Sequence, residues 1–133
     1  MQPTKIDLLI NSRWIIPIVP ENRVFENCAL AIDEQKIVGI YPQAEAATRF
    51  AADSVVDLED HILMPGLVNA HGHAAMSLLR GYADDQALEP WLEEHIWPVE
   101  TRFLSEKFVA DGTKLAMAEM IKTGTTCFAD MYF

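Results

Sequence analysis

The sequence predicts an α/β protein in which a β-rich segment precedes a strand–helix–strand unit with parallel strands. Up to about residue 63, apolar residues come in short β-rich bursts separated by turn-forming clusters. Pro65 and Gly66 then mark a boundary, after which an apolar run, two helical stretches and a second apolar run follow. We therefore expect two segments, 1–63 and 64–133, in this chain of 133 residues.

Short strands and one helix are expected in the first segment. The strands are expected at residues 6–10, 14–19, 28–32, 36–41 and 55–58. Residues 20–22 and 33–35 are turn formers, and residues 44–52 favour one short helix. These elements predict a small antiparallel sheet or sandwich.

The second segment opens with a strand over residues 67–71, which is apolar until its polar end and is expected to be buried. Helices are expected over residues 88–103 and 105–122, with Ser105 as N-cap of the second and Gly124 as its stop. An apolar face on the second helix is formed by Val109, Gly112, Ala116 and Met120. A strand at 125–130 completes the unit. Parallel strands need helices over both sheet faces or around a barrel, which two strands alone cannot provide.

Charge and composition exclude several classes of partner. A net charge of -10 without any basic cluster argues against nucleic acid and anionic membranes. The N-terminus lacks the layout of a signal peptide, and no apolar run reaches the roughly 18 residues of a membrane span. Cys28 and Cys127 lie far apart among apolar neighbours and are expected to be reduced core residues. A cytoplasmic protein is expected.

His71 and His73 form a candidate metal site. In an extended strand, alternate residues face the same side, so the two imidazoles can share one ion, with Gly72 leaving room for close approach. Neutral imidazole suits zinc and similar divalent metals. The pair follows the carboxyl end of an apolar strand, where barrel enzymes place catalytic groups. His61 and His95 are expected to be exposed side chains without a ligand role.

Several motifs resemble the amidohydrolase superfamily. Residues 64–73, MPGLVNAHGH, are similar to its first barrel strand, whose mark is a His-x-His pair after a Pro-Gly-Leu-Val run. The segments most similar to its 5′-methylthioadenosine/S-adenosylhomocysteine deaminase branch are residues 76–85, 90–92 and 96–100. Residues 124–132 resemble the second barrel strand. Gly72 is a departure, because relatives commonly carry Thr there. A side chain at this position would face away from the metal, so ligation is not expected to suffer.

The resemblance implies a (β/α)8 barrel of the TIM type, preceded by strands of a small β-sandwich domain. A complete barrel takes about 250 residues, so this chain would supply only its beginning. Metal binding by His71 and His73 is implied, with zinc as the first choice and iron or manganese as alternatives. The other ligands, a histidine and an aspartate, and the glutamate that handles protons are expected beyond Phe133. The full-length protein is expected to be a homo-oligomer.

The implied activity is hydrolytic deamination of an adenosine derivative: 5′-methylthioadenosine, S-adenosylhomocysteine or adenosine. Glu100 matches the family position that binds the ribose hydroxyls, and Pro98 suggests a break that turns it toward the pocket. Trp91 and Trp97 are candidates for stacking on the purine, with core packing as the alternative. Asp130 permits a hydrogen bond to a ligand histidine; a loop-anchoring carboxylate is the alternative.

Other functions stay open. One is a guanine, cytosine or triazine aminohydrolase or chlorohydrolase of the same superfamily. A ribose-binding acid such as Glu100 would have no role with a substrate that lacks ribose. Another is a non-catalytic truncated module that serves binding or assembly. An incomplete barrel would expose strand edges and apolar surface, so we expect the chain to be a fragment that is inactive by itself.

Overall fold

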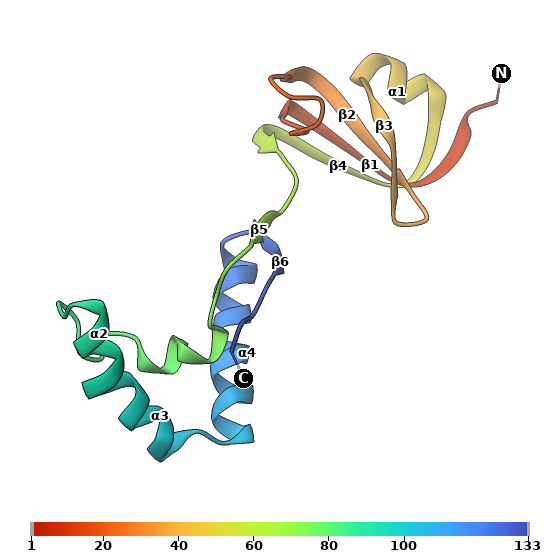
Figure 1. Cartoon of the computed structure of the whole chain (residues 1–133). Coiled ribbons are helices and arrows are strands. Elements are labelled where there is room, and N and C mark those ends of the chain that lie inside the picture. Colours follow the sequence, from red (N-terminus) through yellow and green to blue (C-terminus); the bar gives the residue numbers. More distant parts are fainter. Residues whose placement is uncertain (1, 133) are drawn as a thin grey trace. The chain divides into compact units, whose positions relative to one another are not determined.

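The structure is a computed structural model that describes residues 2–132, and it divides into two compact units, Met1–Pro65 and Gly66–Phe133 (Figure 1). The first unit is mainly β, and the second is mainly helical. Strands and helices together give the chain a mixed α/β fold. No helix among the described residues is long and apolar enough to cross a membrane.

A four-stranded mixed sheet forms the first unit (Figure 1). Its order is β3-β2-β1-β4, with the strands β1 (Thr4–Ile15), β2 (Phe25–Asp33), β3 (Lys36–Pro42) and β4 (Phe50–Leu63). The β1–β2 and β2–β3 pairs are antiparallel, whereas β1 and β4 are parallel. Helix α1 (Gln43–Arg49) makes the connection from β3 to β4 that the parallel pair needs. The expectation of a purely antiparallel sheet is therefore wrong at one strand pair.

The strand expected at residues 6–10 and the start of the one expected at 14–19 are joined in the single strand β1. Because β1 ends at Ile15, the expectation of a strand is wrong for residues 16–19. Its register with β4 shifts after Ser12, whose buried hydroxyl lies 3.0 Å from the carbonyl oxygen of Trp14 and 3.1 Å from that of His61. Such an irregularity redirects a strand without ending it. The polar residues between the two bursts therefore belong to the strand and not to a turn.

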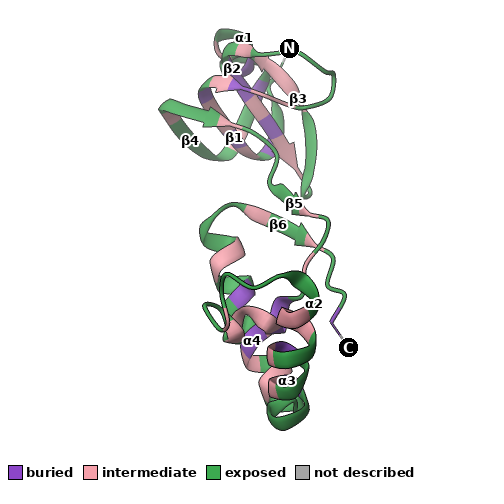
Figure 2. Ribbon diagram, turned by 60° about the vertical axis from the view of Figure 1, so that its left-hand side comes forward, coloured by how far each residue is buried: buried purple, intermediate pink, exposed green. Residues whose placement is uncertain are grey.

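The core of the first unit contains residues of the sheet and α1, coloured as buried in Figure 2. It comprises Ile6, Leu9, Ala29, Ala31, Ala46 and Phe50. The alanines on β2 and α1 are small, which allows the helix to lie close to the sheet. Helix α1 ends at Arg49, and not at residue 52 as expected, because Phe50 begins β4 and buries its side chain in this core.

Over residues 66–132, two parallel strands and five helical segments form the second unit. In chain order they are β5 (Leu67–Asn69), η1 (Ala74–Leu79), α2 (Leu88–Pro90), η2 (Trp91–Ile96), α3 (Trp97–Phe103), α4 (Glu106–Lys122) and β6 (Thr125–Phe128). The predicted order of strand, helices and strand is confirmed, and so is the parallel pairing of β5 with β6.

The helical stretch expected over residues 88–103 is confirmed as α2, η2 and α3 in succession. Segment η2 is a π-helical turn that runs directly into α3, where Pro98 occupies the first turn. Proline lacks an N–H and crowds the turn before it, and a wider turn at that point reduces the conflict. Glu100 follows two residues later and is buried, with 8% of its surface exposed.

Helix α4 begins and ends where the sequence predicts. The Ser105 hydroxyl oxygen accepts a backbone N–H of the first turn at 3.1 Å, and Gly124 follows the last turn with φ of 82°. Gly112 and Ala116 are buried, as the apolar face predicts. Segment η1 lies against this face so closely that a Cβ on Gly112 would stand 2.4 Å from the carbonyl oxygen of Ala75.

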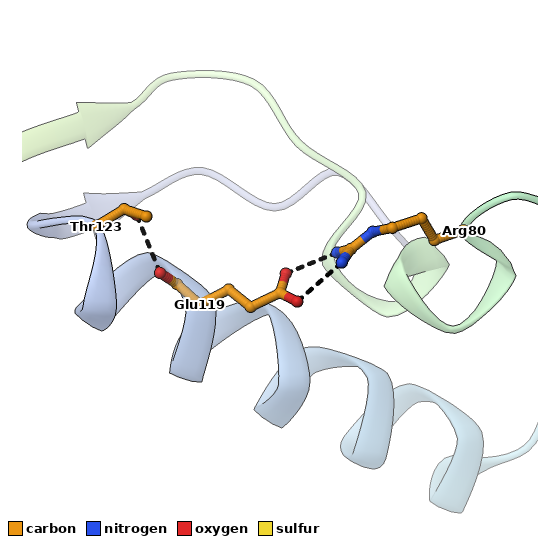
Figure 3. A network of polar contacts seen from close by, with 3 residues as sticks. All are labelled: Arg80, Glu119 and Thr123. Carbon is orange, nitrogen blue, oxygen red and sulfur yellow. Dashed lines mark hydrogen bonds and ion pairs between the residues drawn. The ribbon is translucent and has the colours of Figure 1, made fainter.

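A bidentate ion pair ties the end of η1 to α4 (Figure 3). The Arg80 guanidinium donates to both carboxylate oxygens of Glu119, at 2.8 and 2.6 Å. One turn further along α4, the Thr123 hydroxyl donates to the Glu119 carbonyl oxygen at 3.0 Å. The hydrogen bond with Arg80 lowers the pKa of Glu119. Because the pair is solvent-exposed, its main effect is to orient the two segments.

Strand β5 is more exposed than its apolar sequence predicts. Leu67 is 51% exposed and Val68 is 67% exposed. A strand of a parallel sheet is buried only when other elements cover its faces. The expectation of a buried strand at this position is therefore wrong for the residues that the structure describes.

Candidate functional site

The loop that follows β5 brings His71 and His73 together. Their ring centroids are 5.3 Å apart, and the ring planes are nearly perpendicular, at 86°. The strand ends at Asn69, so the pair belongs to a loop and not to an extended strand as expected. The Asn69 side-chain oxygen accepts the backbone N–H of His71 at 3.3 Å and so links this loop to the strand end.

One ring nitrogen of His73 is engaged by the main chain. Its Nδ1 lies 3.2 Å from the carbonyl oxygen of Met131. A carbonyl can only accept, so this hydrogen bond requires the proton on Nδ1 and leaves the lone pair on Nε2. An imidazole held in this tautomer is suited to bind a metal through Nε2.

The donor set around His71 and His73 fits a divalent metal only in part. Two imidazoles suit zinc, which takes three or four ligands in proteins. Among residues 2–132, no group of three or more histidine, cysteine, aspartate and glutamate side chains is arranged to hold an ion. The described residues therefore provide half of a ligand set, and a metal here needs donors from elsewhere.

The segment after β6 lies beside the histidine loop. The Met131 N–H donates to the Gly72 carbonyl oxygen at 3.0 Å, next to the contact between the Met131 carbonyl and His73. The Asp130 carboxylate accepts the backbone N–H of Ala74 at 3.0 Å, at the start of η1. Asp130 thus anchors the backbone at the start of η1. The sequence leaves this role open as the alternative to a hydrogen bond with a ligand histidine.

A cavity of about 450 Å³ opens beside His73. Its walls are mostly apolar, and the lining residues from the helical stretch are Leu88, Trp91, Leu92, Ile96, Trp97 and Glu100. His73, Met76, Met131 and Tyr132 complete the lining. Four predicted site residues are therefore brought to one cavity: His73, Trp91, Trp97 and Glu100. His71 and Asp130 are not among its lining residues.

Glu100 and Tyr132 form the buried polar contact of this cavity. The Tyr132 hydroxyl donates to Oε1 of Glu100 at 2.8 Å, and both residues are less than 10% exposed, at 8% and 9%. Burial, followed by the hydrogen bond and charge of Glu100, strongly raises the pKa of Tyr132. The phenol therefore stays protonated and acts as a donor to the carboxylate.

The two remaining histidines are His61 in the first unit and His95 in the second. His61 is exposed on β4, in agreement with the expectation. His95 is half-buried and not exposed as expected, because its ring meets Tyr82 edge to face, with centroids 6.2 Å apart. Neither residue lines the cavity beside His73.

Tyr132 was not among the predicted site residues. It lies two residues after Asp130, just beyond the carboxyl end of β6. This end of a parallel strand is where functional groups gather, and a tyrosine there offers a donor in otherwise apolar surroundings. Only this position in the sequence indicates that Tyr132 belongs to the site, because its partner Glu100 is 32 residues away.

Curated proteins similar to this chain cover almost all of it. A 5-methylthioadenosine/S-adenosylhomocysteine deaminase of Teredinibacter turnerae is 52% identical over 98% of this chain. A 5'-deoxyadenosine deaminase of Methanosarcina barkeri is 44% identical over 96% of it. The chain spans 29% and 28% of the lengths of these relatives.

Solved structures agree with these similarities. An adenosine deaminase from Xanthomonas campestris, crystallised with bound zinc, matches with a TM-score of 0.95 and 50% identity, over 98% of this chain and 30% of that one. A triazine hydrolase variant matches with a TM-score of 0.80 and 22% identity, over 92% and 28% of the two chains, and so shares the fold. Residues 62–133, more than half of the chain, match the sequence profile of the amidohydrolase family. The chain therefore belongs to the amidohydrolase family.

Proposed function

We propose that the full-length protein containing this chain is a metal-dependent hydrolytic deaminase of adenosine derivatives. The substrates are 5′-methylthioadenosine, S-adenosylhomocysteine or adenosine, and the products are the inosine analogue and ammonia. The observation that carries the proposal is the shared cavity of His73 and the buried acid Glu100. Relatives with deaminase names at 52% and 44% identity support it.

His71 and His73 would hold the divalent ion, with zinc as the first choice. When bound, the ion supplies the Lewis acid that activates water for attack on the ring carbon bearing the amino group. The hydrogen bond from Nδ1 of His73 to the Met131 carbonyl keeps Nε2 available as a ligand. Zinc in the related Xanthomonas campestris structure favours zinc over iron or manganese.

Glu100 would bind the ribose of the substrate. An ionised carboxylate accepts several hydrogen bonds, so Glu100 can receive ribose hydroxyls in addition to the Tyr132 hydroxyl. Trp91 lines the same cavity and offers an apolar wall for the purine. Asp130 would support the metal site indirectly, by holding the start of η1 directly after His73.

The fold of the full-length protein is part of this proposal. Residues 1–63 would contribute to a composite β-sandwich, and residues 64–133 would supply the first strands and helices of a (β/α)8 barrel. Exposure of Leu67 and Val68 on β5 is consistent with further strands and helices covering them in the complete barrel. We further propose a cytoplasmic homo-oligomer that binds neither nucleic acid nor membranes.

A substrate panel tests the proposed activity. The full-length protein, loaded with zinc, is offered 5′-methylthioadenosine, S-adenosylhomocysteine, adenosine, guanine and cytosine, and ammonia release is measured. Release from adenosine derivatives is expected. Activity confined to a free base, or none at all, would refute the substrate assignment.

A substitution of Glu100 tests its role separately. Glu100→Gln should raise the KM for nucleosides about 10- to 100-fold, because a charged acceptor of the ribose hydroxyls is lost, while zinc content stays unchanged. Glu94→Gln, at an exposed position of the same helical stretch, is the matched control and should leave KM as it is. Equal activity of Glu100→Gln and the unaltered protein would contradict the ribose-binding role.

A further inference from the structure

We propose that Tyr132 is a positioning residue that fixes the Glu100 carboxylate for recognition of the two ribose hydroxyls. This inference rests on the proposed function, because it assigns Tyr132 a part in selecting ribosides over compounds without a cis-diol. Tyr132 has no predicted role in the sequence, and its hydroxyl contacts the Glu100 carboxylate in the cavity.

The contact determines how a buried carboxylate is oriented. Glu100 is on α3, and its side chain has rotatable bonds that allow the carboxylate to point in several directions. The Tyr132 hydroxyl, 2.8 Å from Oε1, occupies one lone pair of that oxygen and restrains the rotation. The second oxygen, and the second lone pair of the first, keep their capacity for substrate hydroxyls. Recognition of a diol depends on this fixed orientation more strongly than recognition of a single hydroxyl.

The position of Tyr132 is fixed in turn by its neighbour in the chain. Met131 is held through both of its main-chain polar groups, by the carbonyl oxygen of Gly72 and by Nδ1 of His73. The Tyr132 ring also meets the His73 ring edge to face, with centroids 6.5 Å apart. One short segment therefore orients the candidate metal ligand and, through Tyr132, the candidate ribose acid.

This arrangement sets the separation between the reacting end and the sugar end of the cavity. A nucleoside has its amino-bearing ring carbon and its ribose hydroxyls at a nearly constant separation within one sugar conformation. A segment that orients His73 and, through Tyr132, Glu100 can hold these two ends of the cavity at a constant separation. Loss of the Tyr132 hydroxyl should therefore weaken riboside binding selectively, and not the site as a whole.

The test compares two substrates in the zinc-loaded full-length protein. Adenosine carries the cis-diol, and 2′,3′-dideoxyadenosine does not. Tyr132→Phe removes only the hydroxyl, and we expect the KM for adenosine to rise about 10-fold while the KM for 2′,3′-dideoxyadenosine and the zinc content stay unchanged. Tyr41→Phe, at a partly buried position packed against the core of the first unit, is the matched control and should change neither KM. In a Glu100→Gln background, Tyr132→Phe should have no further effect on the KM for adenosine.

Other results would overturn the inference. Equal increases of both KM values would mean that Tyr132 only stabilises the fold around the cavity. Unchanged values in Tyr132→Phe would mean that the hydrogen bond does not restrain Glu100. If Tyr132→Phe fails to fold, fluorotyrosine at position 132 serves in its place, because it keeps the side-chain shape and makes the hydroxyl a stronger donor. This change must alter the KM for adenosine and not the KM for 2′,3′-dideoxyadenosine. An unchanged KM for adenosine would refute the role.

A binding measurement separates this inference from the proposed function. Adenosine binding near Trp91 and Trp97 should quench their fluorescence, and this readout does not require turnover. Selective loss of this binding in Tyr132→Phe supports the positioning role even where no ammonia is released. An unaltered protein that neither binds nor deaminates adenosine would refute the proposed function, and with it the role of Tyr132.

Discussion

Replacement of Gly112 by alanine should destabilise the protein, although the same change stabilises most helices. Gly112 lies inside α4, where alanine is ordinarily favoured over glycine by about 1 kcal/mol. The new Cβ, however, would stand 2.4 Å from the Ala75 carbonyl oxygen and 2.8 Å from the Ala75 Cα. Both atoms belong to the backbone, so no side-chain rotation relieves the contact.

The size of the effect follows from these distances. Ordinary contact begins at 3.4 Å, so η1 and α4 must separate by about 1 Å, the difference between 3.4 and 2.4 Å. Overpacking of this kind costs about 1–3 kcal/mol, and the helix-propensity gain offsets only part of it. The difference between the two effects predicts that the free energy of unfolding of Gly112→Ala falls by up to about 2 kcal/mol.

Urea unfolding followed by circular dichroism measures this change in the full-length protein. Ala118→Gly, on the exposed side of α4, is the control and should cost about 1 kcal/mol through helix propensity alone. Because η1 begins directly after His73, Gly112→Ala should also lower zinc affinity, measured by competition with a chelator. A Gly112→Ala protein that is more stable than the unaltered one would refute the close contact between η1 and α4.

Two further predictions concern the metal site and the exposed ion pair. Loss of a residue that only hydrogen-bonds to a metal ligand costs roughly 10- to 100-fold in metal affinity, so His73→Ala should lower zinc affinity by more than this. His61→Ala is the control and should leave zinc affinity unchanged. Equal zinc affinities in both variants would exclude His73 as a ligand. Arg80 lowers the pKa of Glu119, so the contribution of this carboxylate to stability is present above the ordinary glutamate pKa of 4.5 and is lost as the pH falls through its lowered pKa. The midpoint temperature of thermal unfolding of Glu119→Gln should therefore differ from that of the unaltered protein near neutral pH and become equal to it in acid. This difference should also shrink in high salt. A constant difference down to the lowest pH would contradict the assignment.

Local features of the fold could be predicted from the sequence. The cap of α4 at Ser105 and its end at Gly124 depend on residues within a few positions of the helix ends. The order of strand, helices and strand follows from the apolar pattern alone. By contrast, the parallel pairing of β1 with β4 depends on a crossover through α1, and short-range patterns do not distinguish it from a meander.

Burial and side-chain partnership could not be predicted in the same way. Val68 has the residue type of a core strand but is 67% exposed, because burial depends on which elements cover a strand. The proximity of His71 and His73 was predicted from the alternation of side chains in an extended strand. The strand, however, ends two residues before His71. Tyr132 and Glu100 meet across 32 residues of sequence, and only the tertiary structure brings them together.

The hydrogen bond of His73 to the carbonyl oxygen of Met131 makes the orientation of this imidazole resistant to mutation. Where an aspartate or glutamate side chain orients a histidine, a single substitution removes the acceptor. A main-chain oxygen is present whatever side chain stands at position 131. Evolution is therefore free to vary that side chain, which lines the cavity, and to adjust the cavity to other substrates without disturbing the ring of His73.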